Sequence, residues 1–433
     1  MLTTARLFIV GSPVLGALLL SAGCGGHLAS VDNMHRARIE ASPQFKDGVF
    51  VNRLPSDNPI EQGGGWSMLG RWFDGQELRR PTQPIEVVNR SRADFATLVE
   101  PLRVTWLGHS SMLIEIDGRR VLTDPIWSER ASPVTFAGPK RFHDPPLALD
   151  QLPQIHAVII SHDHYDHLDE PTIKALSKQA VSFYVPLGVG AHLRDWGVPD
   201  ARVIELDWWE RASVGDVELV AVPARHRSGR GPLDIDRTLW ASWAVLGPQH
   251  RVFFSGDTGY HNEFVEIGRR LGPFDITLME SGAYNAMWRD SHMGPEQALR
   301  AHRELRGELM VPIHWGTFNL GLHAWTEPAE RLLAGAHERD VRLALPRPGE
   351  SVTPEQIMVA RWWPPQPWQS AAEAPVVSSQ VEPETRLAVC PPEQRAAHGP
   401  ELARLDAPDS RCAKTGSATP VGTAAPGVLR TDS

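Results

Sequence analysis

Four side chains that can bind a metal are packed into six consecutive residues of this chain. The run Ser-His-Asp-His-Tyr-Asp-His contains them as His162, His164, Asp166 and His167. It follows an apolar stretch, 157–160, that is typical of a short buried strand. Because side chains alternate along an extended chain, His162 and His164 point the same way and can share one metal ion. Asp166 and His167 come after the chain has begun to turn, where they can face a second metal.

The alternative interpretation of this run is a solvated polar loop. Four desolvated polar groups at a strand end cost free energy unless something compensates them, and a pair of divalent metals does so. The pattern His-x-His-x-Asp-His after an apolar strand resembles the signature of the metallo-β-lactamase superfamily. The resemblance implies an α+β fold, the four-layer αβ/βα sandwich.

Three more side chains of metal-binding type follow apolar stretches further along the chain. They are His226, Asp257 and His314. Each alone could be structural, but strand ends gather along one edge of a sandwich, so together these side chains can converge on the first motif. The predicted ligands are His162, His164 and His226 for one metal and Asp166, His167 and His314 for a second, with Asp257 bridging.

The ligand types indicate which metal and which substrate the site would take. Imidazole and carboxylate without thiolate suit Zn²⁺, and Mn²⁺ or Fe could also occupy the site. Two divalent ions, two aspartates and a bridging hydroxide together leave one positive charge, which favours a monoanionic phosphodiester. Two metals about 3.5–4 Å apart can hold the attacking and the leaving oxygen, and the bridging hydroxide would be the nucleophile.

Several further segments resemble one branch of the superfamily, the N-acylphosphatidylethanolamine-hydrolysing phospholipase D enzymes. These segments are residues 43–52, 106–110, 223–226, 239–243, 255–260, 292–296 and 313–318, together with Arg230. The resemblance spans about residues 43–345. It implies cleavage of the phosphodiester distal to diacylglycerol, which releases phosphatidic acid and an N-acylethanolamine. Residues 280–285 and Gly294 differ from the animal enzymes and look closer to uncharacterised bacterial relatives.

Two further residues could contact a substrate. His292 precedes a predicted helix and could protonate the leaving alkoxide or hold a phosphate oxygen, with a packing role as an equal alternative. Arg230 could pair with phosphate, or it could be a structural arginine.

We interpret His109 as a supporting or structural residue rather than a ligand. Asp124 is interpreted as a turn or supporting residue.

The composition is that of an ordinary globular protein. The chain has 433 residues, of which 42% are hydrophobic and 22% charged, and its net charge is −9. This acidic balance gives no overall attraction to nucleic acid, so a nuclease is a weak hypothesis. The three cysteines, Cys24, Cys390 and Cys412, are far from the motif, and no thiolate ligand is expected.

The N-terminus predicts export from a bacterial cell. Residues 1–24 combine Arg6 with an apolar stretch that is too short to span a bilayer comfortably. Residues 20–24 resemble a lipoprotein cleavage box, so we expect a lipid on Cys24 that tethers the enzyme to a membrane on the periplasmic side. A signal peptide cut by the ordinary peptidase, or a misassigned start, is the alternative.

Composition and periodicity divide the chain into four regions. These are a leader (1–24), a polar linker (25–42), the hydrolase domain (43–363) and a disordered tail rich in Pro and Ala (364–433). Within the domain, Asp117-Gly118 predicts a β-hairpin. Strands and helices then alternate, and this order favours two packed sheets with helices outside.

We predict a dinuclear-zinc hydrolase that acts on a phosphodiester, with a phospholipid as substrate and a membrane surface as partner. A metal-dependent lactonase or ester hydrolase is the enzymatic alternative, because the same hydroxide attacks carbonyl groups. A lipid-binding lipoprotein with a vestigial site is the non-enzymatic alternative. The oligomeric state is left open.

Overall fold

The computed structural model describes residues 33–61, 78–97, 101–356 and 360–381. The predicted export signal with Cys24, and residues 382–433 of the predicted tail, lie outside these ranges. Within them, no helix is both long and apolar enough to cross a membrane.

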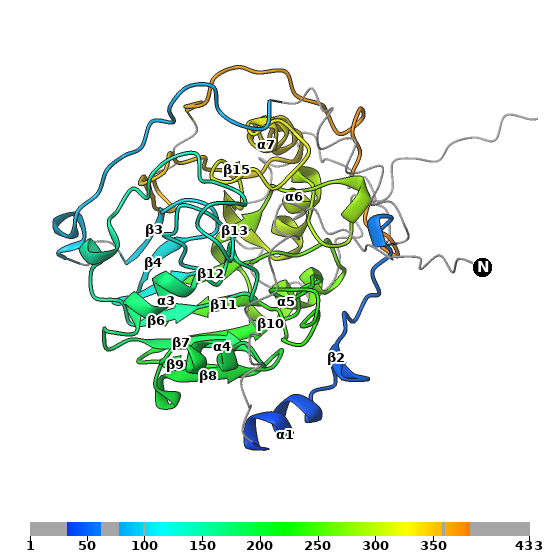
Figure 1. The fold of residues 1–433 in the computed structure, drawn as a ribbon. Coiled ribbons are helices and arrows are strands. Elements are labelled where there is room, and N and C mark those ends of the chain that lie inside the picture. The colour runs from blue at the N-terminus through cyan, green and yellow to red at the C-terminus, as the bar shows by residue number, and fades with distance from the viewer. Residues whose placement is uncertain (1–32, 62–77, 98–100, 357–359, 382–433) are drawn as a thin grey trace, which may run out of the picture. The chain divides into compact units, whose positions relative to one another are not determined.

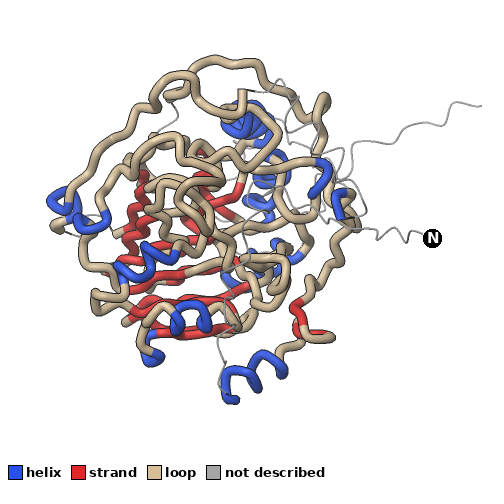
Figure 2. Tube along the Cα trace, in the orientation of Figure 1, coloured by secondary structure: helices blue, strands red, loops and turns tan. Residues whose placement is uncertain are grey.

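Two seven-stranded sheets form the domain (Figure 2). The first has the order β16-β3-β4-β5-β6-β7-β8, and the second has the order β15-β14-β13-β12-β11-β10-β9. The strands of the first sheet are β3 (Leu102–Trp106), β4 (Met112–Ile116), β5 (Arg119–Thr123), β6 (Ala157–Ile159), β7 (Ser182–Pro186), β8 (Val203–Leu206) and β16 (Ser351–Val352). Those of the second are β9 (Arg211–Val214), β10 (Val217–Val222), β11 (Ser242–Leu246), β12 (Arg251–Phe254), β13 (Phe274–Glu280), β14 (Gly307–Ile313) and β15 (Arg342–Leu343).

Helices cover the sheets (Figure 1). The first sheet carries α3 (Glu170–Leu176) and α4 (Gly190–Asp195), and the second carries α5 (Glu263–Leu271), α6 (Pro295–Glu304) and α7 (Glu327–Arg339). In β4, Leu113 packs in one cluster with Ile173 of α3, whereas Met112 and Ile114 pack into the core between the sheets. This alternation is the period of two expected for a strand buried on both faces. The predicted αβ/βα sandwich is confirmed.

The remaining short elements lie between the main ones. They are α1 (Asn33–Ala41), β1 (Phe45–Lys46), β2 (Val49–Phe50) and the 3₁₀ turns η2 (Arg92–Phe95), η3 (Leu149–Gln151), η4 (Asp200–Arg202) and η5 (Ala286–Trp288).

The predicted hairpin joins β4 and β5. Asp117 and Gly118 have φ angles of 43° and 84°, so both central residues have a left-handed backbone conformation. Ile116 pairs with Arg119 across the turn. This is the two-residue turn in which Asn or Asp followed by Gly is favoured.

The structure differs from the sequence prediction at both ends of the domain. Helix α1 occupies half of the predicted linker, and its Arg38 donates a 2.9 Å hydrogen bond to the carbonyl of Glu205. The described part of the predicted tail, 364–381, forms no regular element but hydrogen-bonds to the domain. For example, the Gln369 amide donates to Glu327, and Ser379 donates to Asp290. Composition did not indicate these contacts because they are made by backbone and small polar groups.

Candidate metal centre

The predicted ligands are delivered by strands that end at one edge of the molecule. In the second sheet, β12, β13 and β14 are parallel, and β10 runs in the same direction because both β10 and β12 are antiparallel to β11. Their carboxyl ends carry His226, Asp257, Glu280 and His314 on the strand end or in the loop that follows. The loop after β6 of the first sheet supplies the His-x-His-x-Asp-His motif.

The first group of predicted ligands consists of three imidazoles. Nε2 of His162 lies 2.8 Å from Nδ1 of His164, and Nε2 of His226 lies 3.4 Å from the same atom. One ring nitrogen of each residue lies within 4.8 Å of the other two. The three nitrogens therefore converge on one point, as a metal ion with three histidine ligands requires.

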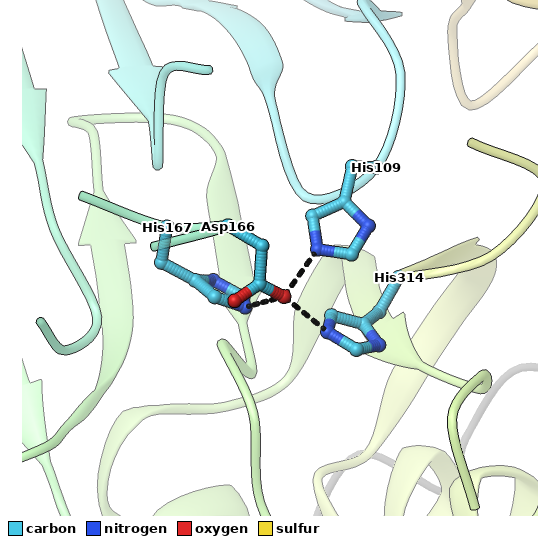
Figure 3. A group of neighbouring side chains, drawn as sticks. All are labelled: His109, Asp166, His167 and His314. Carbon is cyan, nitrogen blue, oxygen red and sulfur yellow. Dashed lines mark hydrogen bonds and ion pairs between the residues drawn. The ribbon is translucent and has the colours of Figure 1, made fainter. Parts of the chain in front are cut away.

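The second group is centred on Asp166 (Figure 3). Its Oδ2 lies 3.2 Å from Nε2 of His167 and 3.3 Å from Nε2 of His314. His109 approaches the same oxygen at 2.9 Å, so it belongs to this group as a direct partner of Asp166. His109 and His314 have φ angles of 51° and 63°, a left-handed conformation that is uncommon for residues other than glycine and is found at functional sites.

Asp257 lies between the two groups. Its Oδ2 is 3.1 Å from Nε2 of both His167 and His314 in the second group. The same oxygen is 3.8 Å from Nε2 of His226 and 4.0 Å from Nε2 of His162 in the first. A carboxylate oxygen in this position can contact metals in both groups.

A second layer of hydrogen bonds orients the ligands. Buried Asp124 accepts from Nδ1 of His167 at 2.7 Å and from Oγ of Ser161 at 2.5 Å. Nδ1 of His162 lies 2.9 Å from the same Ser161 Oγ, and Nδ1 of His226 donates to the carbonyl of Ser291 at 2.8 Å. Each of these contacts leaves Nε2 pointing into the site, as in known metal centres whose histidines are held by outer partners.

The donor set fits a pair of divalent metals. Within the described residues, the buried atoms Nε2 of His167 and Oδ1 of Asp257 have no hydrogen-bond partner. Buried polar atoms without partners are costly and rare, and a metal would satisfy them. Imidazole and carboxylate ligands without thiolate suit Zn²⁺.

The protonation of the metal-free site follows from its charges. Burial lowers the pKa of His162 and His226 well below the ordinary value. Burial also opposes a charge on His314, but Asp257 and Asp166 outweigh it and raise its pKa to about 10. Burial opposes ionisation of Asp257, yet His167 and His314 hold its pKa well below its usual range. The proton on the His314 ring therefore supplies positive charge where a metal cation would otherwise supply it.

Sequence reasoning did not single out Glu280. This glutamate ends β13, is fully buried, and contacts Nδ1 of His292 through Oε1. Its Oε2 accepts a 2.6 Å hydrogen bond from the amide of Thr258, next to Asp257. Burial, reinforced by Asp257, raises the pKa of Glu280 well above its usual range. The signal was available in the sequence, because Glu280 ends an apolar stretch, in the way that the predicted ligands follow theirs.

Arg230 contacts the backbone of the metal-binding loop, which is the structural role that the sequence left open beside a contact with phosphate. Its Nη1 donates 2.8 Å hydrogen bonds to the carbonyls of Asp163 and Leu168. Its guanidinium also lies 4.0 Å from the ring centre of Tyr165 and 5.2 Å from that of Trp196. The planar guanidinium matches two carbonyls and two aromatic faces, so Arg230 braces the loop.

A family model described as "Beta-lactamase superfamily domain" matches residues 119–315. A solved structure of a metallo hydrolase from the archaeon Ignicoccus hospitalis is 22% identical and covers 58% of this chain and 97% of that one, with a TM-score of 0.44.

Two curated relatives extend the comparison. An uncharacterised protein of Mycobacterium tuberculosis is 49% identical over 354 residues, which cover 79% of this chain and 92% of that protein. N-acyl-phosphatidylethanolamine-hydrolyzing phospholipase D 1 of Caenorhabditis elegans is 37% identical over 244 residues, which cover 53% of this chain and 68% of that enzyme.

Proposed function

The chain belongs to the metallo-β-lactamase superfamily and is a metal-dependent hydrolase, and we propose that it hydrolyses a phosphodiester at a two-zinc centre. The substrate class that we propose is a phospholipid, of the N-acylphosphatidylethanolamine type. The relative from Caenorhabditis elegans, whose name states that activity, supports this class.

The observation that carries the proposal is the position of Asp257. Its Oδ2 lies within 4.0 Å of a ring nitrogen from each of the two ligand groups. One carboxylate oxygen lies near two sets of three predicted ligands. This position supports two metals held side by side. Two divalent ions and two aspartates retain enough positive charge to hold a hydroxide and a monoanionic diester together.

When bound, the two metals would supply a hydroxide nucleophile near neutral pH and neutralise charge that develops on the phosphate oxygens. The other residues of the site hold the histidine rings in the orientation that metal binding requires. Asp124 and Ser161 fix the rings of His167 and His162, and the Ser291 carbonyl fixes His226. His292 lies beside the site, with Nδ1 3.8 Å from Oδ2 of Asp257, and we propose that it supplies the proton taken up by the leaving alcohol.

A membrane surface is the proposed place of action. A phospholipid substrate would be reached most directly by an enzyme anchored through a lipid on Cys24, on the periplasmic side of a bacterial membrane. This anchor and this location rest on the sequence pattern of the leader. The acidic net charge of −9 supports the proposal that nucleic acid is not a partner.

Product analysis tests the proposed function. Zinc-loaded enzyme is incubated with a mixed extract of bacterial and N-acylated phospholipids, and the products are identified by mass spectrometry. We expect phosphatidic acid and a released alcohol, and neither product from the Asp257→Asn variant. Unchanged phospholipids in the presence of bound zinc would contradict the proposal and direct attention to lactones and smaller diesters.

A further inference from the structure

We propose that Glu280 is a positioning residue that turns His292 so that its Nε2 faces the leaving oxygen of the substrate. This inference rests on the proposed diester hydrolysis and adds a second residue to its proton-transfer step. Glu280 and His292 come from different elements, the end of β13 and the loop before α6, and meet only in the folded protein.

Glu280 is held by three separate contacts. Its Oε1 contacts Nδ1 of His292, its Oε2 accepts from the amide of Thr258 at 2.6 Å, and its own amide donates to Oγ of Ser255 at 2.8 Å. The side chain is 0% exposed. A carboxyl group with both oxygens engaged and no solvent around it keeps one orientation, so it can fix the ring that it contacts.

His292 differs from the other imidazoles of the site. Its side chain is 18% exposed, whereas His226 and His314 are 2% and 1% exposed. Its ring centre lies 5.0 Å from that of His226 and 5.4 Å from that of His314, so it borders both ligand groups. Nδ1 is taken by Glu280, and in the described part of the chain no hydrogen bond uses Nε2. Nε2 is therefore the ring atom left to meet a ligand.

These contacts define one chemical step. The bond between phosphorus and the leaving oxygen breaks, and its electron pair stays on that oxygen, which takes a proton from Nε2 of His292. The attacking water adds its hydroxyl to phosphorus and loses one proton, which restores His292. The atoms balance with one water consumed, and Glu280 undergoes no net change. This is the arrangement in which a buried carboxylate orients an imidazole for proton transfer.

The alternative is that Glu280 and His292 bind a metal directly, because they form a group with Asp257 and His314 in which one donor atom of each residue lies within 4.8 Å of the others. The two roles differ in what removal of Glu280 does. Loss of a ligand lowers metal content and slows every substrate equally. Loss of a positioning residue leaves the metals in place and slows only substrates whose leaving group needs a proton.

The test compares two leaving groups in the zinc-loaded full chain. One substrate is a p-nitrophenyl phosphodiester, whose leaving group departs without a proton, and the other is an alkyl diester of the same headgroup. For Glu280→Gln and His292→Gln we expect kcat on the alkyl diester to fall about 10²–10⁴-fold with little change in KM. Turnover of the p-nitrophenyl diester and the zinc content should stay within about twofold of the unchanged enzyme. Because the two residues act together, the double variant should be no slower than either single variant.

A spectroscopic readout separates failure of this inference from failure of the proposed function. In the zinc-loaded protein, the hydrogen of the Glu280–His292 contact should give a far-downfield proton resonance that both single variants lose. If the resonance is present but no diester is cleaved by the unchanged enzyme, the pairing stands and the proposed reaction is wrong. Absence of the resonance, equal slowing of both substrates, or loss of zinc in Glu280→Gln would overturn the positioning role.

Discussion

Asp124 and His167 are joined by a 2.7 Å hydrogen bond in which both side chains are fully buried. Asp124 directly follows β5, and His167 lies in the loop after the neighbouring strand β6. The same carboxylate accepts from the amide and the hydroxyl of Ser161, at 2.7 and 2.5 Å. One carboxylate therefore orients the metal-binding loop at both its first residue and its last histidine.

Asp124→Asn should weaken zinc binding. The amide cannot accept from Ser161 and His167 as a carboxylate does, so the ring of His167 loses its fixed tautomer. We expect affinity to fall about 10–100-fold, the usual cost of an outer-shell partner, as measured by competition with a chromophoric chelator. Asp169→Asn is the matched control, since this buried aspartate binds Ser128 and Thr172 and not the metal ligands. Equal affinity in Asp124→Asn and the unchanged protein would contradict the assigned role.

Zinc affinity should rise with pH. The pKa of His314 is raised to about 10 in the metal-free site, and zinc must displace that proton. Apparent affinity should therefore increase between about pH 6 and pH 10, by up to about tenfold per pH unit for each displaced proton. Chelator competition at several pH values measures this slope, and an affinity independent of pH would exclude the assignment of His314 as a ligand.

The same proton predicts how the metal-free fold responds to pH. The pKa of His314 is 6.5 in the unfolded chain and about 10 in the folded, metal-free protein. Protonation of His314 therefore stabilises the fold in full below pH 6.5, and this stabilisation is lost as the pH rises through about 10. The metal-free protein should thus lose stability from pH 7 to pH 10 more steeply than the zinc-loaded protein. Denaturant unfolding with and without a chelator compares the two, and parallel losses would count against the argument.

Ser379→Ala should destabilise the domain, although Ser379 lies in the predicted tail. Ser379 donates its amide and hydroxyl to Asp290 at 2.8 and 2.6 Å, and Asp290 forms a buried 2.8 Å ion pair with Arg225, next to the ligand His226. Removing a hydrogen bond to a buried charge costs about 1–3 kcal/mol of unfolding free energy.

A matched substitution in the same segment controls this prediction. Ser370 is partly exposed, and its hydroxyl donates to the exposed Glu373, so Ser370→Ala should change stability by less than about 0.5 kcal/mol. Urea unfolding of both variants measures the difference. Equal stability of Ser379→Ala and Ser370→Ala would show that the Ser379 hydroxyl contributes nothing to the stability of the domain.

Arg230→Gln should lower zinc affinity and leave substrate binding unchanged. The arginine donates to the carbonyls of Asp163 and Leu168, and its loss frees the loop that carries the motif. We expect a several-fold decrease in zinc affinity, with KM for a soluble diester at saturating zinc within about twofold of the unchanged enzyme. A large increase in KM without a change in zinc affinity would instead support the contact with phosphate inferred from the sequence.

The sequence by itself determined the sandwich and which side chains gather at the candidate metal centre. The motif from His162 to His167 lies within six consecutive residues, and its spacing predicts which of its side chains point the same way. His226, Asp257 and His314 each follow an apolar strand, and the direction of strands in a sheet gathers such positions at one edge. These inferences need only periodicity and the order of elements, which are properties of the chain.

Only the tertiary structure decided which side chains from distant parts of the sequence contact the predicted site residues. The closeness of Asp166 to His109, the pairing of Glu280 with His292 and the bracing of the loop by Arg230 join residues 12 to 67 positions apart. The contact of Ser379 with Asp290 spans 89 positions. Such contacts depend on the register and turn of separate elements, and no local pattern encodes them. Composition alone also could not show that residues 364–381 pack on the domain, because backbone hydrogen bonds to buried carboxylates do not require apolar side chains.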